Sequence, residues 1–133
     1  MHTNYLKADA LSKRVIGAAI EVHREMGPGL IESIYEKCLM WELESQGIPG
    51  RSQLIVSVKY KEHTFDEPLR LDILVDECLL LELKSVEKVL PIHKAQLLSY
   101  MKLLNVPLGL LFNFHELRLR DGIHRMILPG ANQ

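Results

Sequence analysis

The chain has 133 residues, of which 47% are hydrophobic and 25% are charged, and its formal net charge is −1 at neutral pH. This length and composition predict one soluble globular domain that spans residues 1–133, and no apolar run reaches the roughly 18 residues that a membrane span requires. The near-neutral charge argues against a protein that binds nucleic acid over its whole surface, so any such contact must come from a local patch or from metal ions.

The N-terminal segment and the cysteines indicate the compartment. The segment MHTNYLKADALSKR lacks the apolar core of a signal peptide. Cys38 and Cys78 lie in apolar-patterned segments without CxxC spacing, so we expect reduced core cysteines. Together these features predict a cytoplasmic protein.

Two amphipathic helices are predicted at the start of the chain. Apolar residues recur at helical spacing from about Leu11 to Met26, and either Asp9 or Ser12 could cap this helix. The segment Gly27-Pro28-Gly29 ends it, because glycine accepts the left-handed conformation and proline cannot continue a helix. A second helix is predicted from about Ile31 to Gln46.

Strands are predicted next. The segment Gln53–Tyr60 alternates apolar and polar residues, which is typical of a half-buried strand. After a short loop predicted at Asp66-Glu67-Pro68, the segment Leu69–Lys84 (LRLDILVDECLLLELK) has the pattern of two antiparallel strands joined by a tight turn at Asp76-Glu77.

Three charged residues lie in this otherwise apolar hairpin. Folding it about its turn places Asp72 opposite Glu82, and alternation along the strand then projects Asp72, Glu82 and Lys84 from the same side of the sheet. Burying charge costs several kcal/mol, on the order of a whole domain's stability, unless the charge is paired or bound to metal. The cluster therefore indicates a functional site; the alternative is a cross-strand set of salt bridges on a solvated face.

The remaining elements complete an α/β arrangement. A third helix is predicted from Pro91 to about Asn105, and the apolar segment Leu108–Phe114 is typical of a strand covered on both faces. The segments Glu116–Arg120 and Ile123–Leu128 flank Asp121-Gly122 and predict a C-terminal β-hairpin. The order ααβββαβ plus this hairpin indicates an α/β sandwich, with a mixed central sheet flanked by helices.

These motifs match a known family. The segment GLIESIY, Gly29–Tyr35, has a Gly-x-x-Glu-x-x-Tyr signature, and the Asp72 strand, ELKSVEKVLPIHKAQLLSYMKLL and the strand GLLFNF follow in order. From about Leu11 to Leu128 the chain resembles the GxxExxY family of the PD-(D/E)xK nuclease-like superfamily. The resemblance implies a single restriction-endonuclease-like domain with an αβββαβ core. Leu71 stands where the superfamily's name would place proline.

The resemblance also implies residue roles. It implies a nuclease that hydrolyses phosphodiester bonds with Mg²⁺ or Mn²⁺ as cofactor. DNA is the first candidate substrate and RNA the second. Asp72, Glu82 and the Leu83 backbone carbonyl would hold the ion, because hard cations prefer oxygen ligands. Lys84 would orient or deprotonate the attacking water, or stabilise the phosphate charge. Glu32 matches an additional acidic residue that would contact metal or water; the alternative is a favourable interaction with the helix dipole.

Three further residues are candidates on the helices. Tyr35 shares a helix face with Glu32 and could support the site, although a core aromatic with its hydroxyl tied down is the alternative. On the third helix, Gln96-x-x-x-Tyr100 is similar to a Gln and Tyr pair of RecB-type branches of the superfamily. Gln96 could hold a water or a phosphate with support from Tyr100; the alternative is a polar helix edge.

Histidines are candidate zinc ligands, and basic residues are candidate phosphate contacts. The six histidines are scattered and lack zinc-ligand spacing with cysteine. Arg118, Arg120, His124 and Arg125 form the best local basic patch, in the predicted C-terminal hairpin, and could contact phosphates. The alternative is a solvated hairpin face, since Glu116 and Asp121 oppose these charges.

Two function classes remain open at this stage. The presence of both acids and the lysine favours an enzyme acting on nucleic acid. The net charge of −1 favours a catalytically silent binding or assembly module, or an enzyme that needs a partner or a homodimer to build its DNA surface.

Overall fold

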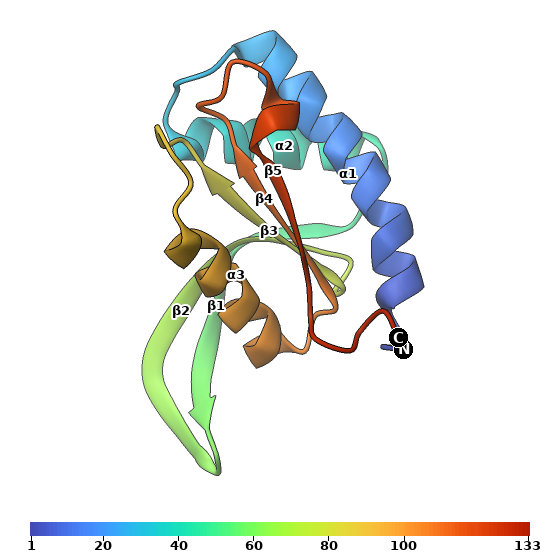
Figure 1. The fold of residues 1–133 in the computed structure, drawn as a ribbon, viewed down its shortest axis with the longest axis vertical. Helices are drawn as coiled ribbons and strands as arrows, with labels where there is room; N and C mark the ends of the chain where they lie inside the picture. Colours follow the sequence, from blue (N-terminus) through green and yellow to red (C-terminus); the bar gives the residue numbers. More distant parts are fainter.

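The computed structural model describes residues 1–133 and shows three helices packed on a five-stranded mixed sheet (Figure 1). The strands lie in sequence order across the sheet; β3 and β4 are parallel, and all other neighbours are antiparallel. This confirms the predicted mixed sheet flanked by helices. The strands are β1 (Gly50–Tyr60), β2 (His63–Val75), β3 (Leu79–Lys84), β4 (Leu108–Asn113) and β5 (Ile123–Ile127).

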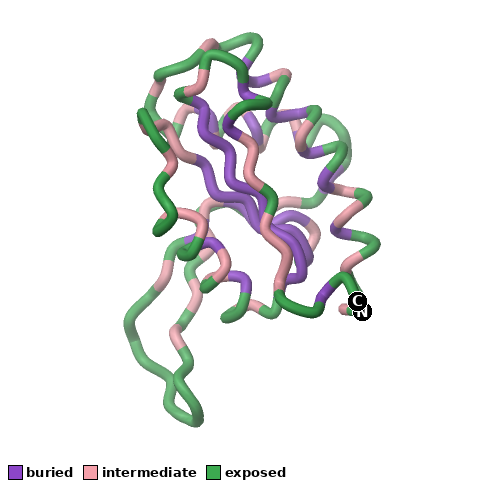
Figure 2. The backbone as a smooth tube through the Cα atoms, in the orientation of Figure 1, coloured by how far each residue is buried: buried purple, intermediate pink, exposed green.

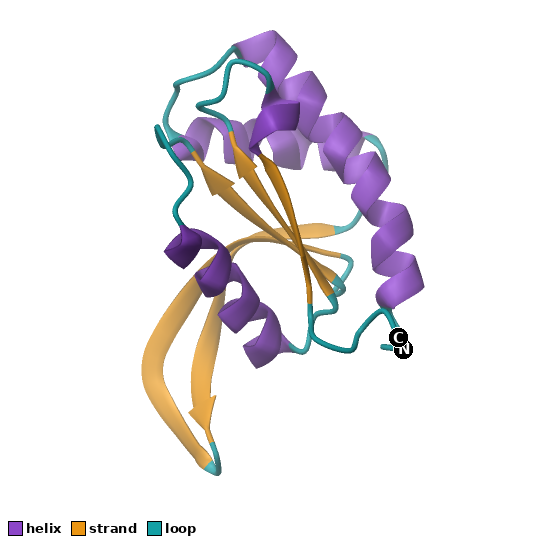
Figure 3. Cartoon of the chain, in the orientation of Figure 1, coloured by secondary structure: helices purple, strands orange, loops and turns teal.

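The helices cover both faces of the sheet (Figure 3). Helices α1 (Tyr5–Met26) and α2 (Glu32–Ser45) bury their apolar residues in the larger core, and α3 (Pro91–Leu104) packs on the opposite face in a smaller one. Helix α3 approaches β4 most closely at Gly109, where an added Cβ would lie 2.7 Å from the Met101 sulfur. No helix combines the length and the apolar character needed to cross a membrane.

The first helix begins earlier than predicted. It starts at Tyr5 rather than near Leu11, so Asp9 and Ser12 lie inside it and do not cap it. The Ser12 hydroxyl instead donates a hydrogen bond to the Asp9 carbonyl at 2.6 Å, and the Asp9 carboxylate binds Arg125 of β5. These polar residues are therefore used in tertiary contacts, which the local pattern does not reveal.

The loop predicted at residues 66–68 is wrong, because β2 runs through it and pairs with β1 as far as Tyr60 and His63. The register shifts between Ser57 and Val58, and Asp66 and Glu67 have no partner in β1. A β-bulge thus accommodates the polar residues, in a two-stranded part of the sheet where a proline is tolerated. This part projects from the body and is exposed (Figure 2).

The predicted C-terminal hairpin is also wrong in part. Residues 116–118 form no strand, Leu119–Gly122 is a short 3-10 helix (η1), and only β5 is extended. Strand β5 pairs with β4 rather than with the preceding segment. A Cβ on Gly122 would lie 2.6 Å from the Asn113 carbonyl oxygen, so this glycine permits a close backbone approach rather than a hairpin turn.

Candidate active site

The candidate site lies where β2 and β3 separate. Their ladder runs from the pair Val75 and Leu79 to the pair Ile73 and Leu81 and stops there. Three residues connect the paired Val75 and Leu79, and the first two of them, Asp76 and Glu77, have φ of 45° and 59°. Extending the register by one step places Asp72 opposite Glu82, as the sequence predicted.

Beyond the last ladder pair, a side chain replaces the main-chain partner. The Leu83 N–H donates to the Asp72 carboxylate at 2.8 Å. The backbone N–H and C=O of one strand residue point to the same side of the strand, so the Leu83 carbonyl also faces the gap between β2 and β3. The gap therefore presents a carboxylate and a main-chain carbonyl to the same space.

A kink in β1 opens the other side of Asp72. Strand β1 pairs Ser52 with Ile73 and Leu54 with Leu71, and the intervening step between Gln53 and Asp72 is skipped. Gln53 has φ of 53°, which is uncommon for a residue other than glycine. Asp72 thus lies at an irregular point of both its ladders.

A cleft of about 100 Å³ lies between α2 and these strands. Glu32 and Glu36 are one turn apart on α2, and the Gln53 amide donates to the Glu36 carboxylate at 2.6 Å. The structure therefore brings Glu32 to Asp72, as predicted, and adds two residues that the sequence reasoning missed. The i, i+4 spacing from Glu32 could have indicated Glu36, whereas no local signal marks Gln53. The lining residues are Glu32, Ser33, Glu36, Gln53, Asp72 and Leu83.

Glu82 is the most strongly perturbed group of the site. It is only 6% exposed, and its Oε1 atom is buried without a hydrogen-bond partner. Burial, and after it the charge of Asp72, raises the pKa of Glu82 to about 8, against the lowering effects of Lys84 and the Asp72 main chain. The side chain therefore carries a proton near neutral pH, because burial disfavours its charged form more than Lys84 favours it.

The neighbouring carboxylates share this environment. Burial raises the pKa of Asp72, while the hydrogen bond from Leu83 and the charge of Lys84 lower it. Burial also raises the pKa of Glu32, with Lys84 lowering it and Asp72 raising it. Lys84 thus interacts with three carboxylates but forms no ion pair within 4.0 Å with any of them. With Glu82 buried, the cluster is not a set of solvated cross-strand salt bridges.

The donor atoms fit a hard divalent cation. Asp72, Glu82 and the Leu83 carbonyl offer only oxygen, the ligand type that Mg²⁺ and Mn²⁺ prefer. The orphaned oxygen of Glu82 is the group that such an ion would satisfy. No three Asp, Glu, His or Cys side chains are grouped closely enough to hold a metal ion by themselves. The carbonyl and oxygens of solvent or substrate would therefore have to complete the ligand shell.

The comparison with protein families shows to which superfamily the chain belongs. Residues 9–126 match the family model of the PD-(D/E)XK nuclease superfamily. The chain belongs to this superfamily. The matched range contains all of the acids above and Lys84. Comparisons with curated proteins and with solved structures return no match. Membership agrees with the mixed sheet between helices, and the narrower GxxExxY assignment stays a prediction.

The end of β3, which carries Lys84, is held by a buried asparagine. The Asn113 side chain accepts the Val86 N–H at 3.1 Å and donates to the Val86 carbonyl at 2.9 Å. The Phe114 N–H donates to the Lys84 carbonyl at 2.8 Å. Asn113 therefore fixes the chain directly after Lys84. Its place as the one polar residue in an apolar strand was the signal that the sequence offered.

The Gly-x-x-Glu-x-x-Tyr segment positions Glu32 through local contacts. The Tyr35 hydroxyl donates to the Gly27 carbonyl at 2.6 Å and accepts the Leu30 N–H at 2.9 Å, and its ring stacks on Phe114. Gly29 has φ of 86°, so glycine is required in this turn. Tyr35 is therefore a core residue that fixes the loop before α2 and so positions Glu32.

The third helix contributes less than predicted. Gln96 is exposed and its side chain makes no hydrogen bond, so its proposed role stays a prediction. Tyr100 is half-buried, and burial raises the pKa of its hydroxyl, as do the charges of Glu82 and Asp72. Tyr100 therefore lies within electrostatic reach of the acids. His93 accepts the Leu90 N–H at 3.0 Å and caps the helix.

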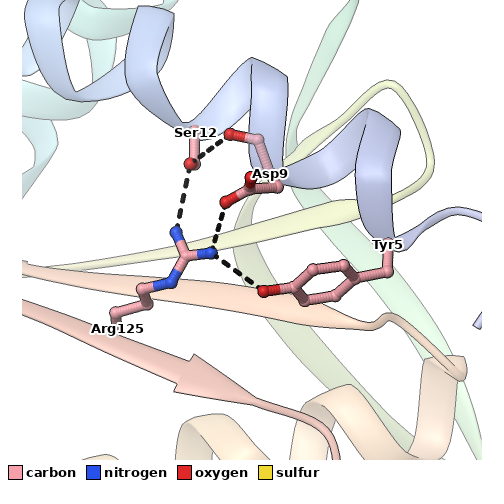
Figure 4. A network of polar contacts seen from close by, with 4 residues as sticks. All are labelled: Tyr5, Asp9, Ser12 and Arg125. Carbon is pink, nitrogen blue, oxygen red and sulfur yellow. Dashed lines mark hydrogen bonds and ion pairs between the residues drawn. The ribbon is translucent and has the colours of Figure 1, made fainter. Parts of the chain in front are cut away.

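The predicted basic patch does not form, because its hairpin does not form. Arg125 binds the Asp9 carboxylate at 2.5 Å, the Ser12 hydroxyl at 3.2 Å and the Tyr5 hydroxyl at 3.3 Å (Figure 4). It therefore joins β5 to α1 and is not free for phosphate. Arg118 pairs with Asp121 at 3.5 Å, and both Arg118 and Arg120 line a separate cleft against α1; His124 is half-buried.

Proposed function

We propose that this protein is a metal-dependent nuclease that hydrolyses phosphodiester bonds of DNA, with RNA as the second candidate substrate. The observation that carries the proposal is the buried carboxylate of Glu82, with one unpaired oxygen, beside Asp72 at the separation of β2 and β3. A divalent ion bound there would satisfy this oxygen, and membership of the PD-(D/E)XK nuclease superfamily supports nuclease chemistry.

The residues divide the chemistry among them. Asp72, Glu82 and the Leu83 carbonyl would hold a Mg²⁺ or Mn²⁺ ion, which when bound would supply positive charge for a phosphoryl transition state and lower the pKa of water. The Lys84 ammonium, directed at the same carboxylates, binds a phosphate oxygen or orients the attacking water. Glu32, from α2, orients water on the other side of the cleft through its carboxylate oxygens.

A binding or assembly module without catalysis is the second candidate. It is favoured by the net charge of −1 and by the engagement of Arg125 with Asp9. A module without catalysis would not require a buried acid such as Glu82, because the ionisation of a buried acid destabilises the fold. The nuclease therefore explains more of the site.

The test is cleavage of plasmid, linear, single-stranded and branched DNA, and of RNA, with Mg²⁺ or Mn²⁺. We expect Glu82→Ala and Lys84→Ala to lower the rate by about 10²–10³-fold, the typical effect of removing one group that stabilises the transition state. Glu87→Ala is the matched control, because Glu87 is an exposed acid of the following loop.

Calorimetric titration with Mg²⁺ and Mn²⁺ gives a readout besides activity. The wild-type chain should bind the ion, and Glu82→Ala should abolish binding. Cleavage that is unchanged in Glu82→Ala and Lys84→Ala would overturn the site. No cleavage of any substrate together with no ion binding would favour the module.

A further inference from the structure

The part of the β1–β2 hairpin that projects beyond the body, residues 55–70, is here called the arm (Figures 1 and 2). Most of its residues are exposed or half-buried, and its two strands pair only with each other. A two-stranded hairpin with few tertiary contacts adds little stability in water. Its length is therefore better explained by contact with a ligand than by stabilisation of the fold.

The register divides the arm into two faces. On one face, Val56, Leu69 and Leu71 lie against Tyr100 and Leu103 of α3. This face is apolar and continues the smaller core.

The other face continues the floor of the acidic cleft. Gln53 and Asp72 line the cleft, and the next pair outward on the same face is Ile55 with Arg70. Ser57 with Pro68 and then Lys59 with Thr64 follow. We call these paired positions the polar face of the arm.

The polar face carries two free cations. Arg70 and Lys59 are exposed and form no ion pair within 4.0 Å, whereas Arg51, at the base of the same strand β1, is paired with Glu77. Arg70 precedes Asp72 by two residues, which is about 6.8 Å along a strand, and Lys59 lies about 14 Å further out. Two cations thus follow the acids in a line.

The arm also carries acids, and their placement matters. Asp66 and Glu67 are the bulge residues without a partner in β1, and Glu62 lies in the turn at the tip. None of the three occupies a paired position of the polar face. Alternation along β2 places Asp66 on the polar face between Pro68 and Thr64, and Glu67 on the opposite face, so one acid lies between the cations Arg70 and Lys59 on the polar face.

We infer that the polar face of the arm binds the sugar-phosphate backbone of a nucleic-acid strand and leads it to Asp72 and Glu82. This inference rests on the proposed function, which makes nucleic acid the ligand. Phosphate contacts position a strand without reading its sequence. Two free cations would provide the local patch that a chain of net charge −1 otherwise lacks.

The test is fluorescence anisotropy of labelled single-stranded and duplex oligonucleotides in EDTA, as a function of salt. Loss of one phosphate contact should reduce the slope of log K against log salt by about 0.7 for single strands or about 0.9 for duplex. We expect this change for Arg70→Ala and for Lys59→Ala, and about twice the change for the double variant. Arg70→Lys should restore most of the slope.

Arg51→Ala and Arg118→Ala are matched controls, because each removes an exposed arginine that pairs with an acid off the polar face. Thermal melts should show that all variants fold, since Arg70 and Lys59 have no partners to lose. Slopes unchanged in Arg70→Ala and Lys59→Ala would overturn the inference even if DNA is cleaved. Arm-dependent binding by a protein that cleaves nothing would support the arm and overturn the nuclease. No binding to any oligonucleotide would overturn the arm as a nucleic-acid surface.

Discussion

The two halves of strand β2 differ more than any other two regions of the molecule. From Leu71 to Val75 the strand is buried apart from half-buried Asp72, whereas from His63 to Arg70 it is exposed apart from half-buried Leu69. The change from exposed to buried residues along β2 occurs between Arg70 and Asp72.

The difference shows how one strand can serve two purposes. In the buried half, low dielectric makes each charge costly, so the ionisation of Asp72 and Glu82 depends on neighbours. In the exposed half, water solvates Arg70 and leaves it free to meet an outside charge. The proposed reactive site and the proposed binding surface thus differ chiefly in how far one strand is buried.

The largest expected effect is on stability. Ile73→Ala, at a fully buried position, should lower the free energy of unfolding by about 2–5 kcal/mol, because it leaves a cavity in the larger core. Phe65→Ala, in the exposed half of the same strand, should cost about 1 kcal/mol or less. Urea unfolding followed by circular dichroism measures both. Equal losses would show that the arm is packed as tightly as the core.

The second effect is the pH dependence that Glu82 imposes on the metal-free protein. Its folded pKa of about 8 lies above the usual value of 4.5, so the folded state holds a proton that the unfolded state has released. Stability should therefore fall as the pH rises from about 5 to 9, by about 2–4 kcal/mol in total.

Glu82→Gln tests this directly, because the amide cannot ionise. Its unfolding free energy in urea should change little over the same pH range and should exceed that of the wild type at pH 9. The exposed Glu87→Gln serves as the control and should follow the wild type. A wild-type stability that is flat from pH 5 to 9 would contradict the burial of a chargeable Glu82.

The smallest expected effect is the response of the protein to a metal ion, which should differ between the two halves of β2. At pH 8, Mg²⁺ or Mn²⁺ at 100 times its dissociation constant should stabilise the protein by about 2.7 kcal/mol. Hydrogen exchange should slow at Asp72 and Leu83, where the ion would lie, and should not change between Tyr60 and Phe65. Glu82→Gln should remove both responses. Protection that extends over the arm would mean that the ion acts elsewhere.

Some parts of the site could be predicted because they depend on local rules. The tight turn that begins at Asp76-Glu77 leaves three residues between the paired Val75 and Leu79, and this register, extended by one step past Ile73 and Leu81, places Asp72 opposite Glu82. Spacing along α2 places Glu32 on the site side of its helix. These features need only the periods of strands and helices.

Other parts could not be predicted, because they depend on residues distant in the sequence. The kink at Gln53 is held by Glu36 of α2, and the loop after Lys84 is held by Asn113 of β4. The C-terminal hairpin was wrongly predicted from Asp121-Gly122, because pairing of β5 with β4 outweighs a local turn preference.

The sequence by itself determined the order of elements from α1 to β4 and the placement of two acids and a lysine on the neighbouring strands β2 and β3, because alternation and helical spacing are local properties of the chain. Only the tertiary structure decided that Glu82 is buried with an unpaired oxygen, that Arg125 is held by Asp9 and that Arg70 is free. The physical reason is that burial and pairing are set by which elements pack together, and the ionisation of a group follows from its burial and its partners.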